Sequence, residues 1–313
     1  MFREKIRNSR ILITGGGGFI GSHLYKNLIE NQNKITIVDS FINQKRTSFP
    51  KAKLYSVDIT STYIKRIFKQ EKPDLIFHLA GPINLRREIS DPLFSAGIKT
   101  IDGFKKILDY SRNYRVKKII FASSGGTIYE DAEIIPTPEI YPAHPSSLYG
   151  LANLFLEKLL REYSKIYKLN FSILRLSNVY GPKQWETGVI PSFIISMLNN
   201  KPPIITGDGS QTRDFIYIDD VITAFCLAAT NKKNEIFNVG SGKEISIYQL
   251  VRRITKILDI RIKPKYVLLK HIKETKRSAL DISKIKKELN WTPKYSLEKG
   301  LERTIEWFKD KKR

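Results

Sequence analysis

Three glycines with the spacing of a phosphate-binding turn follow an apolar stretch near the start of the chain. Gly15, Gly18 and Gly21 come directly after the run ILIT. The first glycine allows a sharp turn, the second leaves room for a pyrophosphate beside the backbone, and the third lets a helix lie close to the strand. The backbone N–H groups of Phe19 and Ile20, where that helix begins, would face the phosphates. Glycine-rich turns also occur in loops that bind no ligand. A second residue is therefore needed to indicate whether this turn binds a dinucleotide.

That second residue is Asp39. It ends another apolar run, residues 35–38, about 20 residues beyond the glycines, where a carboxylate can accept hydrogen bonds from a ribose diol. A carboxylate at this place also repels a ribose 2′-phosphate. The pattern therefore predicts a dinucleotide site that takes NAD rather than NADP.

Two hydroxyl side chains stand in another glycine-rich segment. Ser124 and Thr127 lie within SSGGTIY, directly after the apolar run 116–122. Hydroxyls and glycines at the carboxyl end of a strand are typical of a catalytic loop and equally typical of an ordinary turn, so this pattern leaves both open. For His78, which lies in a further apolar run, a buried histidine with a hydrogen-bonded ring is the interpretation we prefer to a ligand role.

These residues need a scaffold that brings strand ends to one edge of a sheet. Apolar runs and helical patterns alternate through the first half of the chain, which predicts an α/β fold with a Rossmann-type doubly wound parallel sheet. The expected helices begin near residues 19, 91 and 147, and the expected strands or strand-and-turn segments are 11–14, 35–38, 53–57, 74–81, 116–122 and 171–176.

The alternation also predicts the domain organisation. We expect an NAD-binding domain over residues 1–176, to which 219–240 returns, and a smaller C-terminal substrate lobe over 177–313. Short elements and loops replace the regular alternation in that lobe. A helix at 218–229 and a strand at 236–239 are expected to return to the first sheet, and helices near residues 246–258, 282–289 and 296–309 are expected to close the chain.

Other strand ends are expected near the cofactor. Asp58 and Ile59 follow the strand at 53–57, whose carboxyl end lies near the adenine in a doubly wound sheet. The strand that begins at Asp74 runs into a turn at Gly81, where small backbone leaves room for a cofactor.

Composition restricts the class of protein. The chain has 313 residues, 41% of them hydrophobic, with one cysteine and no apolar run of about 18 residues, so we expect a large core without membrane spans or internal disulfides. The start MFREK lacks the apolar part of a signal peptide, and we expect a cytoplasmic location. The net charge of +23 is spread along the chain, which favours attraction of anionic small molecules over nucleic-acid binding. No metal site is predicted.

Taken together, these stretches resemble the extended short-chain dehydrogenase/reductase family, and within it the NAD-dependent nucleotide-sugar epimerases. The resemblance covers nearly the whole chain, and the motifs agree in order and spacing. The motifs that carry it are TGGGGFIGSH at 14–23, Asp39, Asp58-Ile59, HLAG at 78–81 (which adds Leu79 and Ala80 to the cofactor site), SSGGTIY at 123–129, Tyr149-Gly150, NVYGPKQ at 178–184, GDGSQTRDFIYIDDV at 207–221, NVGSG at 238–242 and LDISK at 280–284.

The resemblance implies C4 epimerisation of a UDP-sugar. Hydride would pass from the sugar to bound NAD, the 4-keto sugar would turn, and the hydride would return to the other face. Tyr149 matches the catalytic tyrosine, which takes the proton of the C4 hydroxyl and later returns it, and it is also expected to contact the cofactor. A phenol has a pKa of about 10 and becomes an effective base only when a nearby cation lowers that pKa.

The resemblance also implies substrate contacts in the second lobe. Asn178, Arg213 and Arg277 match positions that hold the substrate's diphosphate, which suits arginine because its planar fork binds phosphate bidentately. Ser278 matches a position that limits the space around the C2 substituent, so an N-acetyl group is expected to fit. Similar dehydratases and decarboxylases carry an acid before the Tyr129 position; this chain has none there, which favours epimerisation.

Three positions depart from the family pattern. Gly125 stands where a catalytic serine or threonine is usual, with Ser124 and Thr127 beside it, and Asn153 stands where the YxxxK lysine is usual. Lys99 replaces the asparagine of the neighbouring helix. One interpretation is an exchange in which Lys99 supplies the charge and Asn153 binds the cofactor ribose. The alternative is that Lys99 faces solvent and the changes are unrelated.

Three functions therefore remain open. The first is a UDP-sugar 4-epimerase, the second a catalytically silent protein that binds NAD and nucleotide sugars, and the third a related NAD-dependent sugar reductase or dehydratase. The resemblance further implies a homodimer in which helices near 91–112 and 147–167 form the interface.

Overall fold

The computed structural model describes most of the chain, and its elements divide between two compact units. The described residues are 6–42, 48–81, 97–186, 188–267 and 275–312. Unit 1 comprises residues 1–128, 143–175 and 222–237, and unit 2 comprises 129–142, 176–221 and 238–313. The segment 129–142 thus belongs to unit 2.

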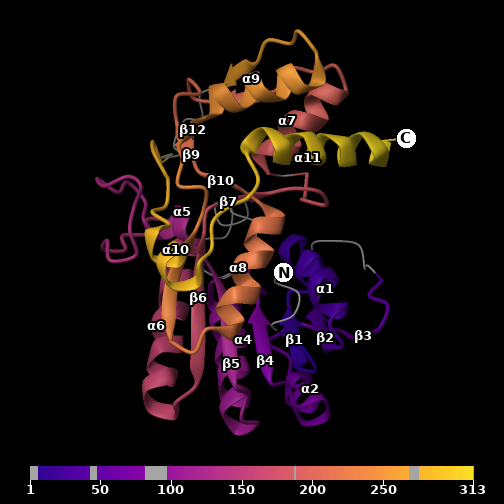
Figure 1. Ribbon diagram of the computed structural model, residues 1–313, viewed down its shortest axis with the longest axis vertical. Helices are drawn as coiled ribbons and strands as arrows, with labels where there is room; N and C mark the ends of the chain where they lie inside the picture. Colours follow the sequence, from indigo (N-terminus) through magenta and orange to yellow (C-terminus); the bar gives the residue numbers. More distant parts are fainter. Residues whose placement is uncertain (1–5, 43–47, 82–96, 187, 268–274, 313) are drawn as a thin grey trace. The chain divides into compact units, whose positions relative to one another are not determined.

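Unit 1 is built on a seven-stranded sheet with the strand order β11-β6-β5-β4-β1-β2-β3 (Figure 1). The described neighbours from β3 to β5 are parallel. The strands are β1 (Arg10–Thr14), β2 (Lys34–Asp39), β3 (Ala52–Ser56), β4 (Leu75–His78), β5 (Lys118–Ser124), β6 (Asn170–Leu176) and β11 (Glu235–Val239). This confirms the predicted Rossmann-like α/β fold.

Helices cover both faces of this sheet, and they bury its strands from both sides. Ile76 of β4 belongs to an apolar cluster with Phe68 and Phe104, while its neighbour Phe77 contacts Phe225. Successive residues of a strand point to opposite faces, so these contacts place helices on each side. The helices are α1 (Phe19–Ile29), α2 (Tyr63–Glu71), α4 (Gly97–Asn113), α5 (Gly125–Ile128), α6 (Leu148–Tyr167) and α8 (Ile218–Thr230).

The sheet register brings the predicted cofactor residues to one edge. The last residue of β1, Thr14, is paired with Val38 of β2 and with His78 of β4. The glycine turn, Asp39 and the segment after His78 therefore all leave the sheet at the same level. The strand order changes direction between β1 and β4, and ligands of doubly wound sheets bind outside the carboxyl ends at such a point.

Unit 2 consists of short elements held by buried carboxylates. Asp214 accepts hydrogen bonds from the backbone of Ser241, Gly242 and Leu280, and Asp220 accepts two more from residues 294 and 295. Burial raises the pKa of both carboxyls, against the effect of these hydrogen bonds. The elements are β7 (Asn178–Tyr180), α7 (Val189–Leu198), β8 (Ile204–Thr206), β9 (Thr212–Arg213), β10 (Phe215–Tyr217), β12 (Ile245–Ser246), α9 (Ile247–Leu258), β13 (Lys265–Val267), α10 (Ser283–Leu289) and α11 (Leu297–Lys312).

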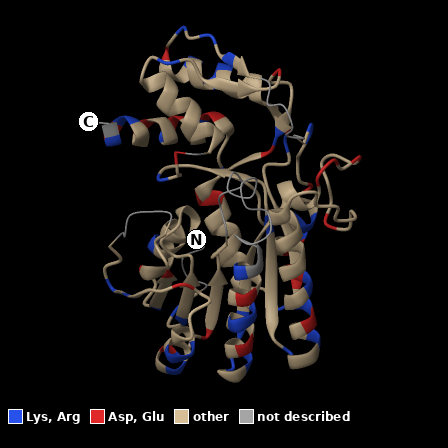
Figure 2. Cartoon of the chain, turned by 180° about the vertical axis from the view of Figure 1, so that it is seen from behind, with Lys and Arg blue, Asp and Glu red and all other residues tan. Residues whose placement is uncertain are grey.

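Charge is distributed over the helices of both units rather than gathered in one arm (Figure 2). Within the described ranges, no helix combines the length and apolar character that crossing a bilayer requires. The predicted start of the helix near Asp91 lies outside the described residues, and α4 is described from Gly97 onwards.

Candidate functional site

The glycine turn has the geometry that its sequence predicted. Gly15 has a φ of +69°, and a Cβ there would lie 2.7 Å from the backbone of Leu79 and Ala80. A Cβ on Gly21 would lie 2.4 Å from the carbonyl oxygen of Gly15. Only glycine therefore allows α1 and the segment after β4 to lie this close to the turn. The helix begins at Phe19, directly after its N-cap Gly18.

Asp39 is half-buried and tied to this turn. Its carboxylate accepts hydrogen bonds from the backbone N–H of Gly17 at 2.9 Å and of Phe41 at 2.8 Å. Burial raises the pKa of Asp39, while these N–H groups oppose the rise. A carboxylate held in this way keeps lone pairs for the hydroxyls of a ribose.

The other predicted cofactor residues lie at neighbouring strand ends. Asp58 accepts hydrogen bonds from the backbone and hydroxyl of Thr60, so part of its carboxylate is already engaged. Ile59 is close to Gly103 of α4, where a Cβ would lie 2.4 Å from the isoleucine side chain. By contrast, a Cβ on Gly81 would meet no atom of the described residues within 4 Å.

His78 is a core residue, as expected. Its Nδ1 lies 2.8 Å from the hydroxyl of Thr14, while its Nε2 has no hydrogen-bond partner in the part of the chain that the structure describes. Burial lowers the pKa of His78 to about 3, so the ring is neutral at ordinary pH. The ring thus links the ends of β1 and β4 by a hydrogen bond, and it adds no charge near the predicted cofactor residues.

Tyr149 lies in the first turn of α6, close to the hydroxyl segment. Ser147 caps this helix by accepting a hydrogen bond from the backbone N–H of Gly150. A Cβ on Gly150 would lie 2.4 Å from the carbonyl oxygen of Thr127, so the residue after Tyr149 must be glycine for α5 and α6 to meet. The Thr127 hydroxyl is buried and has no hydrogen-bond partner among the described residues, whereas Ser124 ends β5. The tyrosine helix and an unused hydroxyl therefore share one corner of unit 1.

The two exchanged residues have different environments. Asn153 is buried, and its Nδ2 donates a hydrogen bond to the carbonyl oxygen of Tyr149 at 2.9 Å, one turn earlier on the same helix face. Lys99 lies in the first described turn of α4 with an exposed side chain. These positions favour the interpretation in which Lys99 faces solvent.

The sequence reading missed a buried ionic network on the same face of α6. Glu157 accepts hydrogen bonds from Nε and Nη2 of Arg175 of β6, the shortest being 2.6 Å, and one from the hydroxyl of Ser123 at 2.6 Å. The side chains of Arg175 and Glu157 are 7% and 2% exposed. Glu157 follows Asn153 by one further helical turn, so the network joins the tyrosine helix to the ends of β5 and β6. Its signal in the sequence is the i, i+4, i+8 spacing of residues 149, 153 and 157.

The predicted diphosphate residues lie in unit 2. Arg213 donates from Nη1 to the carbonyl oxygens of Thr212 and Thr275, both at 2.8 Å. Arg277 forms a bidentate pair with Glu244. The segment of residues 275–278 thus brings Arg277 and Ser278 to the strand that carries Arg213.

Asn178 begins β7, where its backbone N–H donates to the carbonyl oxygen of Asp214. Two residues near it were not predicted. Within the described ranges, the hydroxyl of Ser177 and the Oε1 of Gln184 are buried without a hydrogen-bond partner. Both lie in or beside the NVYGPKQ stretch, and unpartnered buried polar atoms are candidates for ligand contacts.

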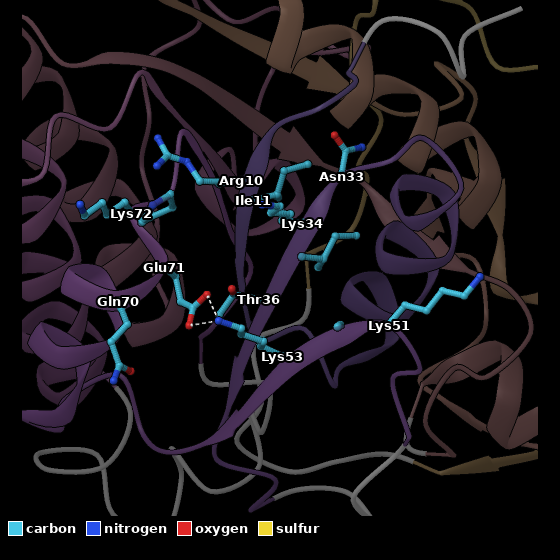
Figure 3. A pocket seen from close by; sticks show the side chains of 13 residues that line it. Arg10, Ile11, Asn33, Lys34, Thr36, Lys51, Lys53, Gln70, Glu71 and Lys72 are labelled. Atoms are coloured by element: carbon cyan, nitrogen blue, oxygen red, sulfur yellow. Dashed lines mark hydrogen bonds and ion pairs between the residues drawn. The ribbon is translucent and has the colours of Figure 1, made fainter.

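A hollow of about 470 Å³ lies elsewhere in unit 1, at the start of β1, β2 and β3 and the end of α2. Figure 3 shows the side chains of Arg10, Lys51 and Lys72 apart from one another, with Lys53 paired to Glu71. Gly15 and Asp39 lie at the opposite ends of the same strands, so this hollow is separate from the predicted cofactor residues.

Comparisons with known proteins agree with this arrangement. The model of the NAD dependent epimerase/dehydratase family matches residues 11–240. The UDP-glucose 4-epimerase of Mycolicibacterium smegmatis is 32% identical over 317 residues, covering 96% of this chain and 99% of that protein. dTDP-glucose 4,6-dehydratases also occur among the relatives.

Solved structures show the same likeness. The UDP-glucose 4-epimerase of Thermotoga maritima, determined with UDP-glucose, has a TM-score of 0.93 and 37% identity, covering 97% of this chain and 99% of that one. The UDP-N-acetylglucosamine 4-epimerase of Methanobrevibacter ruminantium, determined with UDP-N-acetylmuramic acid, has a TM-score of 0.90 and 31% identity, covering 98% and 100%. This chain therefore belongs to the NAD-dependent epimerase/dehydratase family of extended short-chain dehydrogenases/reductases.

Proposed function

We propose that the chain interconverts UDP-sugars at C4 through a transient 4-keto sugar. The observation that carries this proposal is the corner at which Gly150 meets the Thr127 carbonyl. It holds the first turn of the tyrosine helix against a buried hydroxyl that has no partner in the described part of unit 1. Tyr149 then serves as the base for the C4 hydroxyl, and Thr127 or Ser124 supplies the hydroxyl that orients it.

The residues of unit 1 fit the family's cofactor. The glycine turn leaves backbone without Cβ atoms for the pyrophosphate, and the Asp39 carboxylate is held where it can accept from a ribose. Held by these residues, NAD would supply the acceptor for the hydride of C4 and the source from which that hydride returns to the opposite face of the sugar ring. Tyr149 takes the proton of the C4 hydroxyl as the 4-keto sugar forms and gives it back when the hydroxyl is restored.

Product separation after incubation with UDP-glucose, UDP-galactose and their N-acetyl forms tests the proposal. Epimerisation predicts interconversion of each C4 pair with no net change in NAD redox state. Loss of water from the sugar or net formation of NADH would show a dehydratase or a reductase instead. Binding of NAD and UDP-sugar without any product would show the silent binder, which Asn153 favours because it carries no charge to stabilise a phenolate.

The exchange of Asn153 and Lys99 gives a prediction of its own. Because Lys99 is exposed, we expect Lys99→Ala to keep most of the turnover. Asn153→Lys is expected to raise turnover, by at most about tenfold for each unit by which it lowers the phenol pKa, because a larger fraction of the phenol is then ionised. Initial rates of epimerisation measure the turnover of both variants. A Lys99→Ala variant as inactive as Tyr149→Phe would instead establish the exchange, and activity that appears only in Asn153→Lys would support the silent binder.

The size of residue 278 is proposed to decide which sugars fit. Ser278 is small and half-buried, so we expect both UDP-glucose and UDP-N-acetylglucosamine to be substrates. Ser278→Tyr should abolish turnover of the N-acetyl sugar while keeping that of UDP-glucose, because the larger ring fills the space of the acetamido group. Parallel assays with both sugars measure this selectivity, and an equal loss for both would contradict the steric role.

Asp39 is expected to set the preference for NAD over NADP. The wild type should bind NAD more tightly, because the carboxylate accepts from the ribose hydroxyls and repels a 2′-phosphate. Asp39→Asn should weaken NAD binding and reduce the difference between the affinities for NAD and NADP. Titrations with both dinucleotides measure these affinities. Tighter binding of NADP to the wild type would refute this role.

We also propose that the chain forms a homodimer through α6. Leu148, Leu151 and Phe155 lie three and four residues apart, and 42–49% of each is exposed. Side chains at this spacing share one helix face, and a second copy would bury such an apolar stripe. Sedimentation equilibrium of the full chain measures the association.

A further inference from the structure

Arg277 is held by a carboxylate that the proposed function does not use. Its Nε donates to Oε1 of Glu244 at 3.0 Å and its Nη2 donates to Oε2 at 2.5 Å. The hydroxyl of Thr212 donates to the same Oε1 at 2.5 Å. Glu244 is therefore fixed from two sides, by a hydroxyl and by a guanidinium.

Three segments that are far apart in the chain meet here. β9 and β12 are antiparallel, with Thr212 opposite Ser246, which places Glu244 beside the end of this short ladder. The backbone N–H of Thr212 donates to the carbonyl oxygen of Lys276 at 2.9 Å. This bond brings the residue before Arg277 to the same strand. The position of the guanidinium is thus set by backbone pairing as well as by its ion pair.

The ion pair with Glu244 involves only one edge of the Arg277 guanidinium. A guanidinium has five N–H groups, and the contact with Glu244 takes the Nε hydrogen and one on Nη2. The edge formed by Nη1 and the second hydrogen of Nη2 makes no hydrogen bond within the described residues. The side chain of Arg277 is 59% exposed, so a ligand can reach that edge. Two parallel N–H groups at this spacing bind a phosphate bidentately.

A fixed arginine binds an anion better than a mobile one. A free arginine side chain has many rotamers, and ordering it when a ligand binds costs free energy. Without any ligand, the ion pair with Glu244 already restricts the rotamers of Arg277, and the Thr212 hydroxyl holds Glu244 in place. The Arg277 guanidinium also holds the pKa of Glu244 below its ordinary value, so the carboxylate keeps its charge at neutral pH.

We propose that Glu244, held by Thr212, is a positioning residue that presents the free edge of Arg277 to the diphosphate of a nucleotide sugar. This inference rests on the proposed function, because it takes Arg277 as a diphosphate ligand. It goes beyond it by naming the residues that orient this arginine. Glu244 itself touches no phosphate.

Calorimetric titration with UDP and with uridine tests the proposal. Glu244→Gln should lower UDP affinity about tenfold and leave uridine affinity unchanged, because uridine has no phosphate. Thr212→Val should have a smaller effect of the same kind, and Glu244→Asp should restore part of the loss. In an Arg277→Ala background, Glu244→Gln should cause no further loss, since the carboxylate acts only through the guanidinium.

The matched control is Glu298→Gln, which breaks another partly exposed ion pair of unit 2, with Arg253, and should leave UDP affinity unchanged. Unchanged or tighter UDP binding in Glu244→Gln would overturn the positioning role, as would an equal loss for uridine. If Arg277→Ala weakens UDP binding while Glu244→Gln does not, the proposed function stands and this inference fails. A wild type that binds NAD but no UDP would overturn both.

Discussion

Tyr149→Phe is expected to lower turnover about 10²–10⁴-fold, the range lost when a general base is removed. The change deletes the phenol hydroxyl that takes and returns the C4 proton, and it keeps the ring in the first turn of α6. Binding of NAD and of UDP is expected to stay within a few-fold of the wild type, since neither depends on proton transfer. Initial rates with UDP-glucose and separate titrations measure the two effects.

Tyr163→Phe provides the matched control on the same helix. Its hydroxyl donates to Asp109 of α4, well away from the first turn of α6, so its removal should cost some stability and leave turnover unchanged. Equal losses of turnover in the two variants would show that both tyrosines affect activity only by stabilising the fold. Full activity of Tyr149→Phe would remove the proposed base.

Breaking the buried ion pair of unit 1 is expected to produce the largest loss of stability. Glu157→Gln should lower the free energy of unfolding by about 3–5 kcal/mol, because it leaves the Arg175 guanidinium buried without its counter-ion. Urea denaturation followed by circular dichroism measures this. At 7% side-chain exposure, Arg175 has little access to water that could replace the carboxylate.

Removing the polar groups of Ser123, Glu157 and Arg175 together should cost much less. The triple change Ser123→Ala, Glu157→Leu and Arg175→Met removes both charges of this ion pair and the hydroxyl that donates to it, and such apolar replacements are often neutral or stabilising. A triple variant less stable than Glu157→Gln would show that packing, rather than the unpaired charge, dominates. A loss below about 1 kcal/mol for Glu157→Gln would place the pair among weak surface ion pairs.

The residues proposed to hold the cofactor could be predicted from the amino-acid sequence because their signals are local. Gly15, Gly18 and Gly21 lie within one strand-turn-helix unit, and the apolar run before them is buried as its pattern predicted. Asp39 could be placed because parallel strands end at a shared edge, so its position followed from counting along two apolar runs. The alternation of strands and helices indicated the doubly wound sheet, which the structure confirms. The same local reasoning placed Asn153 one turn after Tyr149.

Contacts between groups that are far apart in the chain could not be predicted, because they form only when the chain folds. Ser123 lies 34 residues from Glu157, and Glu244 lies 33 residues from Arg277, so no local pattern pairs them. The short ladders of unit 2 have two or three residues, too few for a period to be read, and each forms because a distant strand supplies its hydrogen bonds. The contact of Gly150 with the Thr127 carbonyl arises in the same way, because α5 and α6 meet only once the chain has folded around the sheet.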